Sequence, residues 1–190
     1  MSSWPRVNIT QKIQQALLLG ISLLGILSAQ ANHPTLPELK AAYTLNFARF
    51  TDWPAPEQTT APLQFCVVGN NETTTALMEL KGTIYGRPVM ARSLRLPGNI
   101  EGCALLYLTD IPQYRLSRIL TALKGKTLLT ISDIPGFASK GGMIELLIKN
   151  QRLRFKINRK AVHQSGLKLD IKLLKLAIHV YPKDLEQTAP

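Results

Sequence analysis

Short, uninterrupted apolar runs in this chain alternate with segments whose apolar residues recur every three or four positions. The apolar runs predict buried strands, because a strand covered on both faces has no polar side to alternate with. These predicted strands are 63–68, 104–108 and 128–131. Residues 87–96, with Pro88 near their start, predict a further strand.

The segments with three- and four-residue spacing predict amphipathic helices at 38–50, 73–81 and 112–124. The apolar face of the first helix is expected to consist of Leu39, Ala42, Tyr43, Phe47 and Phe50. Gly82 is expected to end the second helix and Gly125 the third, because glycine is common just after a helix.

A period of two appears after residue 142, where two apolar strands flank the polar turn Lys149-Asn150-Gln151. Between 152 and 157, apolar and basic residues alternate. Leu153, Phe155 and Ile157 are expected in the core, and Arg152, Arg154 and Lys156 on the opposite face. The pattern therefore predicts an antiparallel hairpin with a basic exposed face.

The end of the chain predicts two more helices. Asn158 is expected to cap a short one that stops at Gly166. Asp170 is expected to cap a last one that runs to Pro182 and carries His179. Its apolar face is expected to consist of Leu173, Leu174, Ala177 and Ile178.

Strands that alternate with helices favour a parallel sheet with helices on both faces. We therefore predict a single α/β domain, a three-layer sandwich whose mostly parallel sheet becomes mixed through the late antiparallel hairpin. Its length suits one domain with a substantial core.

Residues 1–31 have the pattern of a secretory signal peptide. Arg6 and Lys12 precede an apolar run at 13–27 without acidic residues, and small residues two apart follow at Ala29 and Ala31. The run is about 15 residues long, short of the roughly 20 that a spanning helix needs, although an uncleaved membrane anchor is the alternative. We expect cleavage after Ala31, a mature domain at 32–190 and a periplasmic location.

The charge is strongly basic. The formal charge is +11, and since Arg6 and Lys12 are the two charged residues of the first 31, the mature domain keeps +9. In a cytosolic protein this would favour nucleic-acid binding, but export argues against it. A solvated basic surface, an acidic protein face, a nucleotide and an anionic membrane surface remain the alternatives.

Cys66 and Cys103 both lie in the mature domain, and an even pair in an oxidising compartment predicts a disulfide. No histidine neighbours them, and His33, His163 and His179 lack metal-ligand spacing, so we expect no metal and no cofactor. No acid–base pair, nucleophile or nucleotide-binding glycine motif stands out, so we expect no enzymatic activity.

The loop at 133–142 is rich in proline and glycine. Its glycines Gly136, Gly141 and Gly142 permit backbone angles closed to other residues. Phe137 is expected to pin the loop to the core, with exposure to a partner as the alternative. Gly141 and Gly142 either form a tight turn or bind an anion through backbone N–H groups.

Six stretches, taken together and in order, resemble the YfiR-like family of periplasmic proteins. They are LKAAYTLNFARFTDWP at 39–54, FCVVGN at 65–70, GRPVMARSL at 86–94, LLTISDIPGFASKGGMIELLI at 128–148, RFKINRKAVHQSGL at 154–167 and LLKLA at 173–177. The resemblance covers nearly the whole predicted mature domain.

The resemblance implies a non-enzymatic repressor that binds the periplasmic region of an inner-membrane diguanylate cyclase, or another sensor protein, and so lowers cyclic di-GMP and biofilm formation. It also implies a homodimer and sequestration by an outer-membrane lipoprotein. Cys66 and Cys103 match a family disulfide. Some members have a second pair near 138–147, which this chain lacks.

Two functional hypotheses follow. The residues expected to bind a partner or a ligand are Asp133, Phe137, Gly141, Gly142, Arg152, Arg154 and Lys156. A protein-binding repressor would use a contact that includes the late hairpin and the last helix. A periplasmic protein that binds a nucleotide or other small anion would use a pocket at the strand ends, at 69–71, Asp110 and 132–142.

Overall fold

The computed structural model describes residues 33–54 and 60–182. Apart from His33, these residues belong to one compact unit that begins at Pro34. The predicted signal peptide and its cleavage site lie outside the described residues.

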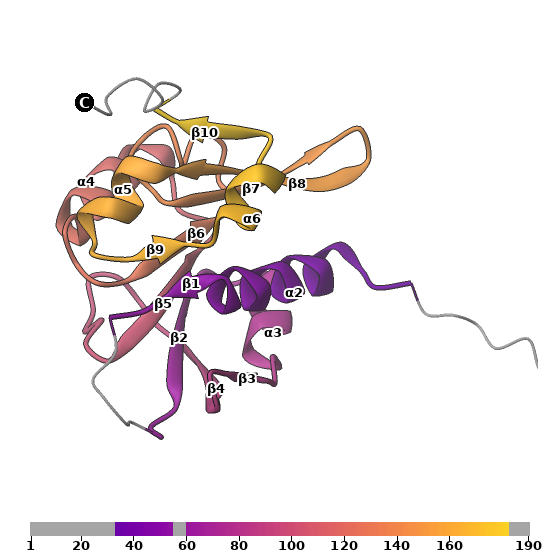
Figure 1. Ribbon diagram of the computed structural model, residues 1–190, viewed down its shortest axis with the longest axis vertical. Coiled ribbons are helices and arrows are strands. Elements are labelled where there is room, and N and C mark those ends of the chain that lie inside the picture. The colour runs from indigo at the N-terminus through magenta and orange to yellow at the C-terminus, as the bar shows by residue number, and fades with distance from the viewer. Residues whose placement is uncertain (1–32, 55–59, 183–190) are drawn as a thin grey trace, which may run out of the picture. The chain divides into compact units, whose positions relative to one another are not determined.

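An eight-stranded sheet forms the centre of this unit, in the order β10-β8-β7-β6-β5-β2-β4-β3 (Figure 1). The strands are β2 (Leu63–Val68), β3 (Thr83–Ile84), β4 (Arg87–Ser93), β5 (Cys103–Leu108), β6 (Leu129–Ser132), β7 (Ile144–Lys149), β8 (Arg152–Asn158) and β10 (His179–Tyr181). Neighbours are parallel except in the β3–β4 and β7–β8 pairs. The predicted mostly parallel, mixed sheet is confirmed.

Helices lie on both faces of the sheet, as predicted. They are α2 (Leu36–Arg49), α3 (Glu72–Met78), α4 (Gln113–Leu123), α5 (Arg159–Gln164) and α6 (Ile171–Leu176). Strand β5 shows the two faces, because its side chains alternate between them. Leu105 and Tyr107 pack in the core that includes α2, whereas Leu106 and Leu108 pack in the core beneath α4.

The buried face of α2 differs from the prediction. Ala42 and Phe50 are exposed, and Ala41, Thr44, Leu45, Phe47 and Ala48 are buried. The prediction treated Thr44 as polar and excluded it. Its hydroxyl donates to the carbonyl oxygen of Lys40 at 2.8 Å, so the residue satisfies its own polar group and can face the core.

The second predicted helix ends earlier than expected. α3 stops at Met78, and Gly82 does not cap it. The carbonyl of Gly82 instead accepts a hydrogen bond from the N–H of Val89 at 2.9 Å, next to the β3–β4 hairpin. Pairing within that hairpin, rather than the helix, fixes the conformation of this glycine.

The prediction of a long last helix is wrong. α6 begins after its cap Asp170, as expected, but ends at Leu176. The N–H of Ile178 then donates to the carbonyl of Phe155 at 2.9 Å, and His179 begins the edge strand β10, which pairs in parallel with β8. The free backbone groups of β8 thus draw residues 178–181 out of a helical conformation.

A small second sheet, which was not predicted, pairs β1 (Thr51–Asp52) with β9 (Lys168–Leu169). It joins the end of α2 to the approach to α6. The N–H of Asp170 adds a hydrogen bond of 2.9 Å to the carbonyl of Phe50.

Candidate functional site

A disulfide joins the two central strands β2 and β5. Cys66 and Cys103 have Cα atoms 5.8 Å apart, and both residues are buried. The predicted bridge is therefore confirmed. It closes a loop with a sequence separation of 37 residues, which would stabilise the fold by about 4 kcal/mol on the chain-entropy model.

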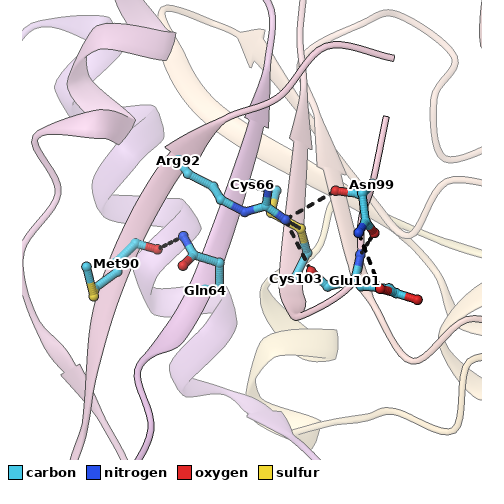
Figure 2. The surroundings of a disulfide bond; sticks show 7 residues. All are labelled: Gln64, Cys66, Met90, Arg92, Asn99, Glu101 and Cys103. Carbon is cyan, nitrogen blue, oxygen red and sulfur yellow. Dashed lines mark hydrogen bonds between the residues drawn. A yellow bond between two sulfur atoms is a disulfide. The ribbon is translucent and has the colours of Figure 1, made fainter. Parts of the chain in front are cut away.

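Arg92 of β4 connects this disulfide to the loop at 94–102. Figure 2 shows its side chain pointing toward the bridge. One guanidinium nitrogen, Nη2, donates to the carbonyl oxygens of Asn99 and Glu101 and contacts Cys103 Sγ, at 3.2 Å in each case. The sequence analysis did not single out Arg92, because it is one of three arginines in the predicted strand 87–96 and nothing in the sequence distinguishes it.

The loop at 133–142 is packed against the protein by Phe137, whose side chain is fully buried. A Cβ atom at Gly142 would collide with the Phe137 ring, so only glycine fits this position. Gly141 has a φ of +109°, which favours glycine. The interpretation of Phe137 as a core residue is confirmed, whereas a role of Asp133, Phe137, Gly141 and Gly142 in partner or ligand binding stays a prediction.

Glu145 connects this loop to the hairpin through hydrogen bonds. The sequence analysis did not identify this residue. Its carboxylate is buried, with the side chain 2% exposed, and it accepts hydrogen bonds from the N–H of Ala138 at 3.1 Å and from Lys156 Nζ at 3.0 Å. A glutamate in a predicted apolar strand, opposite a lysine in the next strand, was the available signal.

The ion pair with Glu145 changes the predicted basic face of the hairpin. Arg152, Arg154 and Lys156 do share one face of β8, as predicted, and Leu153, Phe155 and Ile157 are buried on the other. Lys156, however, is neutralised by Glu145 and is only 24% exposed. Lys149 lies directly opposite Arg152, and both are exposed, while Arg154 is partly exposed; we call Lys149, Arg152 and Arg154 the hairpin cations.

The carboxyl ends of β2, β5 and β6 bring together the residues of the predicted strand-end pocket. There the side chains bond to one another or to neighbouring elements. Asp110 accepts from the N–H of Asn70 at 3.4 Å, and the Asn71 amide donates to Thr109 Oγ1 at 2.9 Å. Asp133 forms an ion pair of 2.6 Å with Lys40 of α2.

Tyr107 lies below these residues in β5. Its hydroxyl is fully buried and has no hydrogen-bond partner among the described residues. Burial, reinforced by the negative charges of Asp133 and Asp110, raises the pKa of Tyr107 well above its ordinary value. The phenol therefore stays neutral at any physiological pH.

The elements at the end of the chain expose an apolar surface. Ile171 and Leu176 of α6 are 62% and 67% exposed, and Ile178, which follows α6, is 38% exposed. They precede β10, which forms one edge of the sheet (Figure 1). An exposed edge strand with apolar neighbours is a surface to which another chain can add.

Within the part of the chain that the structure describes, no helix has the length and apolar content needed to cross a membrane. Among the same residues, no group of three or more His, Cys, Asp or Glu side chains is arranged to hold a metal ion.

Comparison with known proteins identifies one family. The model of the YfiR/HmsC-like family matches residues 37–178, which include all the helices and strands described above except the first residue of α2 and strand β10.

Proposed function

Because the chain belongs to the YfiR/HmsC-like family, we propose that it is a periplasmic regulator, without enzymatic activity, that represses an inner-membrane signalling protein. The partner we propose is the periplasmic region of a diguanylate cyclase, so that the protein lowers cyclic di-GMP and biofilm formation. Export through a cleaved signal peptide at 1–31, a homodimeric state and sequestration by an outer-membrane lipoprotein belong to the same proposal.

The family match over residues 37–178 is the observation that carries this proposal. The disulfide between Cys66 and Cys103 supports the periplasmic location, because structural disulfides persist in oxidising compartments.

The late hairpin, α6 and β10 form the surface that we assign to the partner. α6 exposes the apolar side chains of Ile171 and Leu176, and β8 presents two of the hairpin cations, Arg152 and Arg154, on the face opposite the one that packs with α6. Apolar residues at the centre of an interface supply affinity, while charges at its rim mainly set the association rate. The hairpin cations would suit an acidic surface on the partner, and we assign that surface to the cyclase.

Binding of the purified protein to the solubilised cyclase tests the proposal. Arg152→Ser with Arg154→Ser should slow association, most visibly at low salt, because rim charges steer diffusional encounter. Lys81→Ser with Lys124→Ser removes the same charge from exposed positions elsewhere and is the matched control. Equal slowing by both pairs would mean that net charge, not this surface, governs binding.

In cells, deletion of the gene should raise cyclic di-GMP and surface attachment, and the intact gene should restore both. If cyclic di-GMP stays unchanged on deletion, the proposed cyclase partner is wrong.

A further inference from the structure

A cavity of about 620 Å³ lies between α4 and the loop that follows β4. It is lined by Leu96, Pro97, Gly98, Ile100, Tyr114, Arg115, Arg118, Ile119, Ala122, Leu123 and Lys126. Cavities of roughly 300–1,000 Å³ are typical of small-molecule sites. This one lies between α4 and the loop after β4, whereas the surface assigned to the partner involves β7, β8 and β10 at the opposite end of the strand order, so the two are separate.

The floor of the cavity is apolar. Leu96, Ile100 and Ile119 are only partly buried and pack against the core beneath α4, and Leu123 belongs to that core. Surface of this kind in a concave site is favourably covered by an apolar group, since about 25 cal/mol is gained for each Å² removed from water.

The polar part of the lining is cationic. Its charged residues are Arg115, Arg118 and Lys126, beside the hydroxyl of Tyr114, and among the described residues that line the cavity none is acidic. Arg115 and Arg118 are three residues apart and thus neighbours on the helix surface. Arg115 Nη2 donates to the carbonyl of Leu96 at 3.2 Å, so its guanidinium reaches from α4 to the opposite wall.

Arg115 occupies an electrostatically unfavourable place. Arg115 lies in the first turn of α4, a helix of 11 residues, and that turn has no acidic residue and no side-chain cap. The positive end of the helix dipole and the arginine repel each other, whereas an anion would interact favourably with both. The apolar floor and the cations therefore favour a ligand that has both an apolar part and an anionic part.

We propose that this cavity binds a free, single-chain amphipathic anion, with its apolar chain over Leu96, Ile100 and Ile119 and its anionic head between Arg115 and Arg118. An inorganic anion would leave the apolar floor in water, and a neutral hydrophobic molecule would leave the two guanidinium groups without a counter-charge. This binding site stands independently of the proposed repressor function.

Decanoate is a suitable probe, titrated calorimetrically into the disulfide-bonded protein. Decanol has the same chain without the charge, and acetate has the carboxylate without the chain. We expect decanoate to bind at least about tenfold more tightly than decanol, because a charge-assisted hydrogen bond contributes a factor of this order. We expect a similar advantage over acetate, because only decanoate covers the apolar floor. Equal binding of decanol or of acetate would overturn the two-part site.

Two variants locate the binding. Arg115→Gln with Arg118→Gln should lower decanoate affinity about tenfold or more and leave the weak decanol binding unchanged. Ala122→Phe should weaken binding of both, because the ring takes up part of the cavity without a change of charge. Far-ultraviolet circular dichroism confirms that each variant is folded.

The control is Lys149→Gln with Arg152→Gln, which removes two of the hairpin cations and should leave decanoate affinity unchanged. Loss of affinity in this control, or full affinity in the Arg115 and Arg118 variant, would mean that decanoate binds elsewhere. Vesicles of phosphatidylglycerol provide the last test. If they bind with the same dependence on Arg115 and Arg118, the site is a membrane-docking surface and the proposal of a free ligand is wrong.

Discussion

The ion pair between Glu145 and Lys156 is unequally exposed, and this asymmetry predicts unequal effects of removing each partner. The Glu145 side chain is 2% exposed and that of Lys156 is 24% exposed. Without Lys156, the N–H of Ala138 would be the one partner left to the buried carboxylate among the described residues. Without the Glu145 charge, by contrast, the Lys156 ammonium can turn toward water.

The magnitudes follow from this exposure. Lys156→Met should lower the free energy of unfolding by about 3 kcal/mol, because an uncompensated buried charge costs of that order. Glu145→Gln should cost about 1 kcal/mol, because the amide oxygen still accepts from Ala138 and the exposed lysine loses little. The double variant should cost less than the sum of the two.

Urea unfolding of the disulfide-bonded protein at pH 7 measures these differences, provided that the dependence on urea concentration stays the same in each variant. Arg154→Met is the control, since Arg154 shares the face of Lys156 on β8 and has no salt bridge among the described residues. It should change stability by less than about 0.5 kcal/mol. Equal losses for Lys156→Met and Glu145→Gln, or a larger loss for the glutamate, would refute the reasoning from burial.

Three further outcomes are expected. Cys66→Ser should lower the free energy of unfolding by about 2–5 kcal/mol, and in the native protein both cysteines should resist alkylation until a reductant is added; thiols that react beforehand would contradict the bridge. Phe137→Ala should cost about 3–5 kcal/mol in urea unfolding, because the ring is fully buried and a cavity replaces it; a small loss would show that the loop does not depend on the ring. The raised pKa of Tyr107 contributes stability below the unfolded-state pKa of about 10, which is lost as the pH rises above it; Tyr107→Phe should remove that loss in alkaline unfolding curves, and an unchanged curve would assign the loss to other groups.

The local pattern predicted the elements that depend on local chemistry. Strand β2 was predicted at both ends, because an apolar run bounded by Pro62 and Gly69 has few alternatives. The β7–β8 hairpin was predicted through its alternation and its polar turn. In the structure, Asn150 and Gln151 both have positive φ, as a tight hairpin turn requires.

The missed features depend on residues distant in the sequence. β10 was taken for helix because its pairing with β8 is invisible to periodicity. The role of Glu145 required the cross-strand register that places it opposite Lys156. Arg92 could not be connected to the disulfide until β4 was known to lie beside β2.

The candidate site shows the same division. The loop glycines and Phe137 could be assigned a packing role, since their backbone requirements are local. The residues at the strand ends could be predicted to lie together, but their contacts could not, because the Asp133 carboxylate is neutralised by Lys40, 93 residues earlier in the chain.

The position of the disulfide has a consequence for the order of assembly. Both cysteines lie before residue 104, whereas α4, the 133–142 loop, the late hairpin and the edge strand all follow it. If the chain crosses a membrane starting from its amino end, the first strands would reach an oxidising compartment before residues 104–190 had crossed. The bridge would then tie β2 to the start of β5 and leave one side of β5 open for β6. Oxidation early in export would thus fix the β2–β5 pair first, and β6, β7, β8 and β10 would then add to the free side of β5.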